Sequence, residues 1–179
     1  MRRIQYISGT LVFGCVILMS GTSLLAEEQM HQAPAVSKEL EQVKALVGRW
    51  EGTSQDEGKE AQPAAVEYKV TSGGSAVVET LFPGTPHEMV SVYHDQHGKL
   101  AMTHYCMLGN HPELALTNAS DTELDFSLAE GSGIDAAKEQ HMHALALTQS
   151  DAGHLSQVWT CYEGSKPSHK VTIALSRAH

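Results

Sequence analysis

The stretch Leu46-Val47-Gly48-Arg49-Trp50-Glu51-Gly52 separates two sequence patterns in this chain. Before it, the apolar residues between positions 40 and 47 recur at helical spacing and give one apolar face. After it, the apolar period changes to two, as between positions 66 and 70, where valine and tyrosine alternate with charged residues. The stretch therefore marks the end of a short amphipathic helix and the start of a region made of β-strands.

The expected helix has recognisable signals at both ends. Ser37 is a suitable N-cap, and Glu39 and Glu41 lie near the helix N-terminus, where the helix dipole favours acids. Gly48 suits the C′ position, because glycine adopts the left-handed conformation that ends a helix. We therefore predict a helix that begins after Ser37 and ends before Gly48.

The region after Gly48 predicts an all-β domain of about ten short strands joined mostly by tight turns. No helical segment of crossover length lies between them, which argues against βαβ units. Sequential hairpins give an antiparallel meander, and closure into an up-and-down barrel removes its exposed edges. A β-sandwich is the alternative. The expected strands after the first are 66–70, 75–82, 88–94, 100–108, 114–116, 124–128, 141–149, 154–162 and 170–175.

Residues 1–26 have the layout of a secretory signal peptide. Arg2 and Arg3 form a basic start, a mostly apolar run follows, and Ala26 is a small residue before two glutamates. The polar residues 20–23 interrupt the apolar run, which leaves it short for a membrane span of about 20 residues. We expect cleavage after Ala26 and export to the periplasm or the medium, with an uncleaved anchor as the alternative.

Cleavage would leave a polar, mobile leader at 27–36 and one barrel domain at 37–179. Loss of two arginines and no acid would take the formal net charge from −9 to −11. Such an acidic protein is a poor binder of nucleic acid. We expect no stable membrane span after cleavage, and the oligomeric state is left open.

The helix, Gly48 and Trp50 at its end, and the roughly ten strands resemble the calycin superfamily, and within it the bacterial lipocalin-like proteins. The resemblance implies a barrel around a small-molecule cavity, with Trp50 closing one end and Gly48 and Gly52 in structural roles. It implies no catalytic residue. The chain also resembles the nitrobindin-like haem barrels, whose C-terminal haem-ligating histidine would correspond to His169, although their glycine-rich continuation after the tryptophan is absent here.

Alternation predicts which histidines face the barrel interior. His104 has the parity of Leu100 and Met102, although the other face of that strand is also fairly apolar. His141 and His143 share the parity of Leu145 and Leu147, and His169 that of Val171 and Ile173. Histidines two apart on a strand lie about 7 Å apart on one face. His141 and His143, with His169 from a neighbouring strand, are therefore candidate metal ligands. The alternative is histidines that are hydrogen-bonded or solvated.

Two cysteines remain after the expected cleavage. Cys106 and Cys161 both have the parity of inward residues, on strands that are not neighbours in a meander. Export favours a disulfide between them. The bond needs Cα atoms within about 7 Å, so the barrel would have to be flattened there. A disulfide and two buried thiols remain alternatives.

These observations predict an exported barrel that binds a small, largely apolar ligand. The predicted ligand-binding residues are His104, Cys106, His141, His143, Trp159 and His169. A barrel that holds haem or a divalent metal is the alternative; otherwise no cofactor is predicted. An enzyme using a cavity histidine with Glu79 or Tyr105 is the least favoured reading, since no catalytic motif is present. Glu79 is expected to point outward, the commoner orientation of glutamate.

Overall fold

A computed structural model describes residues 35–178 of the chain. The predicted signal peptide at 1–26 and all but the end of the predicted leader lie outside the described residues. One short helix, α1 (Lys38–Lys44), precedes the first strand. The helix is shorter than predicted. Ala45 is its C-cap, and Gly48 is the first residue of β1 rather than the C′ residue of α1.

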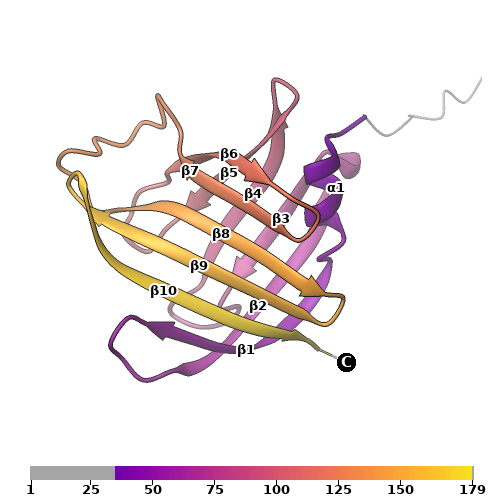
Figure 1. Cartoon of the computed structure of the whole chain (residues 1–179), viewed down its shortest axis with the longest axis horizontal. Helices are drawn as coiled ribbons and strands as arrows, with labels where there is room; N and C mark the ends of the chain where they lie inside the picture. The colour runs from indigo at the N-terminus through magenta and orange to yellow at the C-terminus, as the bar shows by residue number, and fades with distance from the viewer. Residues whose placement is uncertain (1–34, 179) are drawn as a thin grey trace, which may run out of the picture. The chain divides into compact units, whose positions relative to one another are not determined.

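Ten antiparallel strands close into a barrel, as Figure 1 shows. Each strand pairs with the next along the chain, and the last pairs with the first, so the predicted up-and-down barrel is confirmed. The strands are β1 (Gly48–Asp56), β2 (Gln62–Thr71), β3 (Ala76–Leu81), β4 (Met89–Gln96), β5 (Lys99–Tyr105), β6 (Glu113–Ala119), β7 (Glu123–Leu128), β8 (His141–Asp151), β9 (His154–Glu163) and β10 (Lys166–Arg177).

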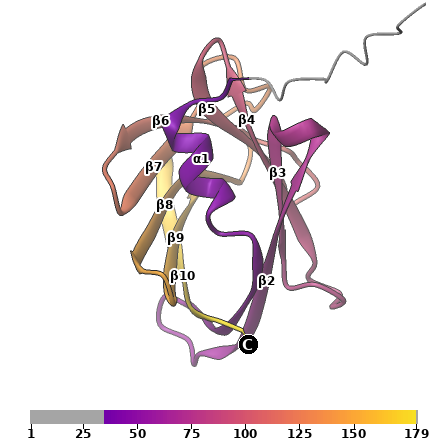
Figure 2. The same cartoon turned by 90° about the vertical axis from the view of Figure 1, so that its right-hand side faces the viewer.

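The helix lies across one end of the ring of strands, as Figure 2 shows. Leu40, Val43 and Leu46 are buried in the barrel core on that side. The backbone N–H and the hydroxyl of Ser37 both donate to the carboxylate of Asp95, at 2.6 Å, while its hydroxyl accepts the Leu40 N–H. One serine therefore caps the helix and ties its start to β4.

Trp50 is fully buried beside this helix. Its indole N–H donates to the Leu46 carbonyl at 2.7 Å, and the Arg177 guanidinium lies 4.2 Å from the centre of its ring. The same guanidinium donates to the carbonyls of Ala45 and Val47, which follow the helix and have no intrahelical partner. Arg177 thus joins the end of β10 to the start of β1 and closes this end of the barrel.

Two glycines in the opening stretch meet specific backbone demands. Gly48 has a φ of +123°, a conformation that residues with a Cβ rarely adopt. At Gly52, an added Cβ would lie 2.0 Å from the Ala174 carbonyl oxygen on β10. Only glycine therefore allows β1 to approach β10 this closely.

Residues 35–178 contain no helix that is long and apolar enough to cross a membrane.

Candidate functional site

A partly open cavity of about 450 Å³ lies inside the barrel, at the end opposite α1. Its rim includes Asp56, Lys59 and Glu60 from the β1–β2 turn, His87 from the β3–β4 loop and Met107 from the β5–β6 loop. The wall is mostly apolar and includes Leu81, Phe82, Met89, Met142, Val171 and Ile173. A volume of this order suits a small molecule, and flexible methionines adapt their shape to one.

Two predicted site residues form part of the cavity wall, namely His104 on β5 and Trp159 on β9. Their rings pack together with centroids 4.6 Å apart, and both side chains are buried. Burial lowers the pKa of His104 from 6.5 to about 4, because the charged imidazolium would lose its hydration. The imidazole is therefore neutral at pH 7.

A row of directly opposed polar residues crosses four neighbouring strands on the inner face of the barrel. Tyr68 on β2 pairs with Glu79 on β3, Glu79 with Ser91 on β4, and Ser91 with His104 on β5. All four side chains are buried. The Tyr68 hydroxyl donates to Glu79 at 2.6 Å, and the Ser91 hydroxyl lies 3.0 Å from His104 Nδ1. The row therefore connects His104, in the cavity wall, to a fully buried carboxylate.

Glu79 is held by donors from several strands, and its predicted outward orientation is wrong. Besides Tyr68, Tyr93 donates to the carboxylate at 3.1 Å, and Gln157 donates to it at 2.5 Å. Burial raises the pKa of Glu79 above 4.5, while the hydrogen bonds from Tyr68, Ser91, Gln157 and Tyr93 lower it. The pKa values of Tyr68 and Tyr93 are also raised by burial and by the nearby carboxylate, so both remain donors.

Trp159 fixes the orientation of Gln157. The indole N–H, which can only donate, lies 2.9 Å from the Gln157 amide oxygen. The amide nitrogen must then face the other way, where it donates to Tyr68 at 2.7 Å and to Glu79. Since the N–H of Trp159 is used in this network, its ring offers the cavity mainly an apolar surface.

The inward orientation predicted for His141 and His143 is wrong, and a β-bulge is the reason. Met142 pairs with Cys161, but the next pair is Ala144 with Thr160, so His143 is an extra residue in β8. The bulge reverses the alternation, and Met142 lines the cavity instead. His141 pairs with Tyr162. Because the adjacent Cys161 is on the inner face, Tyr162 and His141 are on the outer face.

The two histidines instead form a cluster with Tyr162 on the other face of the sheet. The ring of His143 stacks on Tyr162 at 3.8 Å, and His141 Nε2 lies 3.1 Å from His143 Nδ1. His141 is fully buried, with Nδ1 2.8 Å from the Glu139 carbonyl. Burial and the neighbouring His141 lower the pKa of His143.

The structure does not bring the three predicted metal ligands together. His169 pairs with Cys161 and so keeps the inward parity, on the opposite side of the sheet from His141 and His143. Its Nδ1 lies 3.1 Å from the Ser168 hydroxyl. Within residues 35–178, no three histidine, cysteine or acidic side chains are arranged to hold a metal ion.

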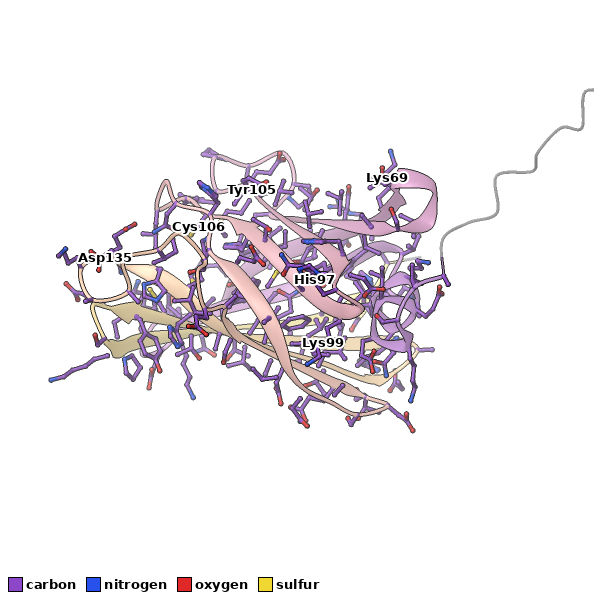
Figure 3. The ribbon with its side chains drawn as sticks, turned by 90° about the horizontal axis from the view of Figure 1, so that it is seen from above. Lys69, His97, Lys99, Tyr105, Cys106 and Asp135 are labelled. Carbon is purple, nitrogen blue, oxygen red and sulfur yellow. The ribbon has the colours of Figure 1, made fainter. Side chains whose placement is uncertain are left out.

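Cys106 and Cys161 are free thiols in this structure. Cys161 is buried, and Cys106 is partly buried just after β5, toward the end of the barrel away from α1, as Figure 3 shows. Burial raises the pKa of the Cys106 thiol, and Cys161 is near enough to raise it further. Neither cysteine lines the cavity, so the cysteine predicted as a ligand contact lies outside its wall.

The two residues predicted as alternative partners of a catalytic histidine lie in different surroundings. Tyr105 is exposed and its ring stacks on His111, whereas Glu79 is buried and enclosed by its donors. With a pKa near 4, His104 is also a weak base at neutral pH.

Sequence reasoning missed Ser91, Tyr93 and Gln157 as parts of this site. Gln157 carried a usable signal, because it has the parity of Leu155 and Trp159 in an otherwise apolar row. A polar residue in such a row requires a buried partner. The identity of that partner depends on contacts between β9 and β3, which no local pattern indicates.

Comparison with known proteins places the chain in no established family. No family model matches it, and no curated protein does. Among solved structures, a redesigned β-barrel, mFAP1, bound to DFHBI has 12% identity, with 76% of this chain and 97% of that chain covered and a TM-score of 0.39. EF1p2_mFAP2b bound to DFHBI has 10% identity, with 78% of this chain and 98% of that chain covered and a TM-score of 0.40. A redesigned barrel, b11L5F_LGL, has 12% identity, with 76% of this chain and 95% of that chain covered and a TM-score of 0.38. At these values nothing about the ligand of this chain follows from them.

Proposed function

We propose that this protein is an exported, lipocalin-like barrel that binds a small, largely apolar molecule in its interior. The observation that carries the proposal is the partly open cavity of about 450 Å³ with an apolar wall. The other end is closed by α1, Trp50 and Arg177, which leaves the rim of the cavity as the route of entry. Burial of apolar ligand surface in such a cavity supplies the driving force for binding.

Binding of Nile red, a neutral apolar probe, tests this function. We expect a saturable rise in its fluorescence on addition of the protein. A matched pair of variants shows where the probe binds. Val171 lines the cavity, whereas the adjacent Thr172 is exposed on the other face of β10. Val171→Phe should weaken binding, because the ring takes up cavity volume, and Thr172→Phe should leave it unchanged.

Two results would refute the proposal. If Nile red does not bind the folded protein, the cavity does not accept an apolar molecule of this size. If both phenylalanine variants bind it as the unmodified protein does, the probe occupies another surface.

Export has its own test. The signal-peptide layout of residues 1–26 supports it, and cleavage after Ala26 would give a mature chain of 153 residues that begins at Glu27. N-terminal sequencing of protein recovered from a bacterial cell envelope or medium should find Glu27. Recovery of the protein with an intact Met1 in the cytoplasm would contradict export.

A further inference from the structure

One buried polar atom in the cavity wall lacks a hydrogen-bond partner. Across the described chain, three buried side-chain atoms are unpaired, and His104 Nε2 is the one that belongs to a cavity-lining residue. The His104 side chain is almost fully buried, at 1% exposure. An unpaired buried polar group costs free energy, which a ligand group that pairs with it would recover.

We infer that the cavity selects neutral, apolar molecules that carry a hydrogen-bond donor at their inner end, a hydroxyl or N–H group, and that His104 Nε2 accepts its hydrogen. This inference rests on the proposed function and names the chemical class of its ligand. Two features of the site support it, the tautomer of His104 and the charge around that side chain.

The tautomer follows from the polar row. Ser91 has one hydroxyl hydrogen and lies directly opposite Glu79 on β3, whose carboxylate can only accept, so we place this hydrogen toward Glu79. The Ser91 oxygen then accepts from His104 Nδ1–H across their 3.0 Å contact. With its hydrogen on Nδ1, the neutral ring has a free lone pair at Nε2. A ligand hydroxyl or N–H group can donate to this lone pair, whereas an ether oxygen or a carboxylate cannot.

The charge around His104 also disfavours an anionic ligand group. Among the described residues that line the cavity, Lys59 is the one lysine or arginine. It lies in the β1–β2 turn at the rim, so within the described chain the inner wall has no cationic side chain. Beyond Ser91 lies the Glu79 carboxylate, which would repel an anion placed against His104. A carboxylate would therefore remain at the rim or outside, and a neutral donor group would enter more deeply.

Trp159 gives this binding mode a spectroscopic signal. His104 Nε2 is buried, and the Trp159 ring packs against the same imidazole. We expect a ligand donor that reaches Nε2 to displace this ring. The other tryptophan, Trp50, lies at the closed end beneath Arg177, so it should be insensitive to the ligand.

The test compares three ligands of nearly equal length: 1-decanol, methyl nonyl ether and decanoate at pH 7.5. Each competes with Nile red for the full-length protein. We expect 1-decanol to bind about tenfold more tightly than the ether, a difference of about 1.4 kcal/mol, because only the alcohol pairs the buried acceptor. Decanoate should bind most weakly, and only 1-decanol should shift the emission of Trp159.

Variants of the acceptor provide the control. His104→Phe keeps an apolar ring and should reduce the preference for the alcohol over the ether below twofold. His104→Gln, whose amide oxygen can accept, should retain part of it. His154→Gln, at an exposed histidine near the β8–β9 turn, should keep the full preference. The comparison of ligands in the unmodified protein remains decisive if a variant fails to fold.

Three results would overturn the inference. Equal affinity for the alcohol and the ether would show that Nε2 accepts nothing, and tightest binding of decanoate would contradict the charge argument. A Soret band on addition of hemin that His104→Phe abolishes would make Nε2 a metal ligand instead. If neither Nile red nor any of the three ligands binds, the proposed function itself is refuted. This outcome differs from failure of the inference alone, in which Nile red still binds.

Discussion

His104 should make the barrel sensitive to acid. Its pKa is about 4 in the folded protein, against 6.5 as the ordinary value. Below pH 6.5 the unfolded chain therefore binds a proton that the folded protein does not bind until about pH 4. The stability that His104 contributes is fully present above pH 6.5 and is lost as the pH falls through this interval.

The size of the effect follows from the two pKa values. At about 1.4 kcal/mol for each pH unit, the interval from 6.5 to about 4 corresponds to about 3.5 kcal/mol, of which about 3 kcal/mol is lost by pH 4, where His104 is half protonated in the folded protein. His104 is almost fully buried, so solvent screening reduces this little. Against a typical unfolding free energy of about 5–15 kcal/mol, the loss is readily measurable.

Urea unfolding of the unmodified protein and of His104→Gln, between pH 4 and 7.5, isolates the contribution of His104 to the free energy of unfolding. Glu79 acts in the opposite direction, because burial raises its pKa and its contribution is lost as the pH rises. It is present in both proteins, as is His143, and therefore cancels to first order in the difference. We expect the stability advantage of the unmodified protein to fall by about 3 kcal/mol between pH 7.5 and 4. A difference that stays constant with pH would show that His104 titrates normally, and would refute its burial as a neutral ring.

Three further predictions concern the frame of the barrel, and urea unfolding measures each. Gly52→Ala should largely prevent folding, because its Cβ would lie 2.0 Å from a carbonyl oxygen of β10. Gly153→Ala, where the nearest atom is 3.4 Å from the added Cβ, should fold. Equal stability of the two variants would contradict the close approach of β1 to β10. Arg177→Lys should cost about 1–2 kcal/mol, because lysine cannot both cover Trp50 and donate to two carbonyls; no loss would show that charge alone suffices. Gln157→Met should cost about 3 kcal/mol, because it removes hydrogen bonds to Glu79, Tyr68 and Trp159, and a cost below about 1 kcal/mol would count against this network.

The barrel was predictable because it depends on local patterns. Alternation marks each strand, and short turns leave few alternatives to a meander. The helix was predicted at the right place but too long, because Leu46 has helical spacing while Arg177, far along the chain, binds the carbonyls that follow the helix. Such a long-range partner leaves no trace in the sequence near the helix end.

The candidate site was predicted only in part, and the bulge in β8 shows why. Side chains alternate between the two faces of a strand only while each residue has one partner on the neighbouring strand. His143 has none, so His141 and Met142 lie on the faces opposite to those that alternation predicts. No glycine or proline marks the position. His104 lies on a strand where pairing is regular up to Tyr105, and its inward parity agrees with its burial.

Glu79 illustrates a second limit. Glutamate is usually exposed because burial of its charge is costly, and this general rule gave the outward prediction. Here Tyr68, Tyr93 and Gln157 offset that cost, each from a different strand. Those residues can be recognised as partners only after closure places their strands around one interior.

The pairing of β1 with β10 has a consequence for how the chain acquires its structure. Trp50 lies opposite Arg177, so the first and last strands must meet before the ring is complete. Contacts between such distant segments carry a large loop-closure entropy, and proteins rich in them fold slowly, in milliseconds to seconds. Until β10 arrives, β1 and β9 each have an unpaired edge that can recruit another chain. The closing step is therefore the stage at which aggregation competes with folding, and substitutions that slow it should lower the yield of protein even where the finished barrel is stable.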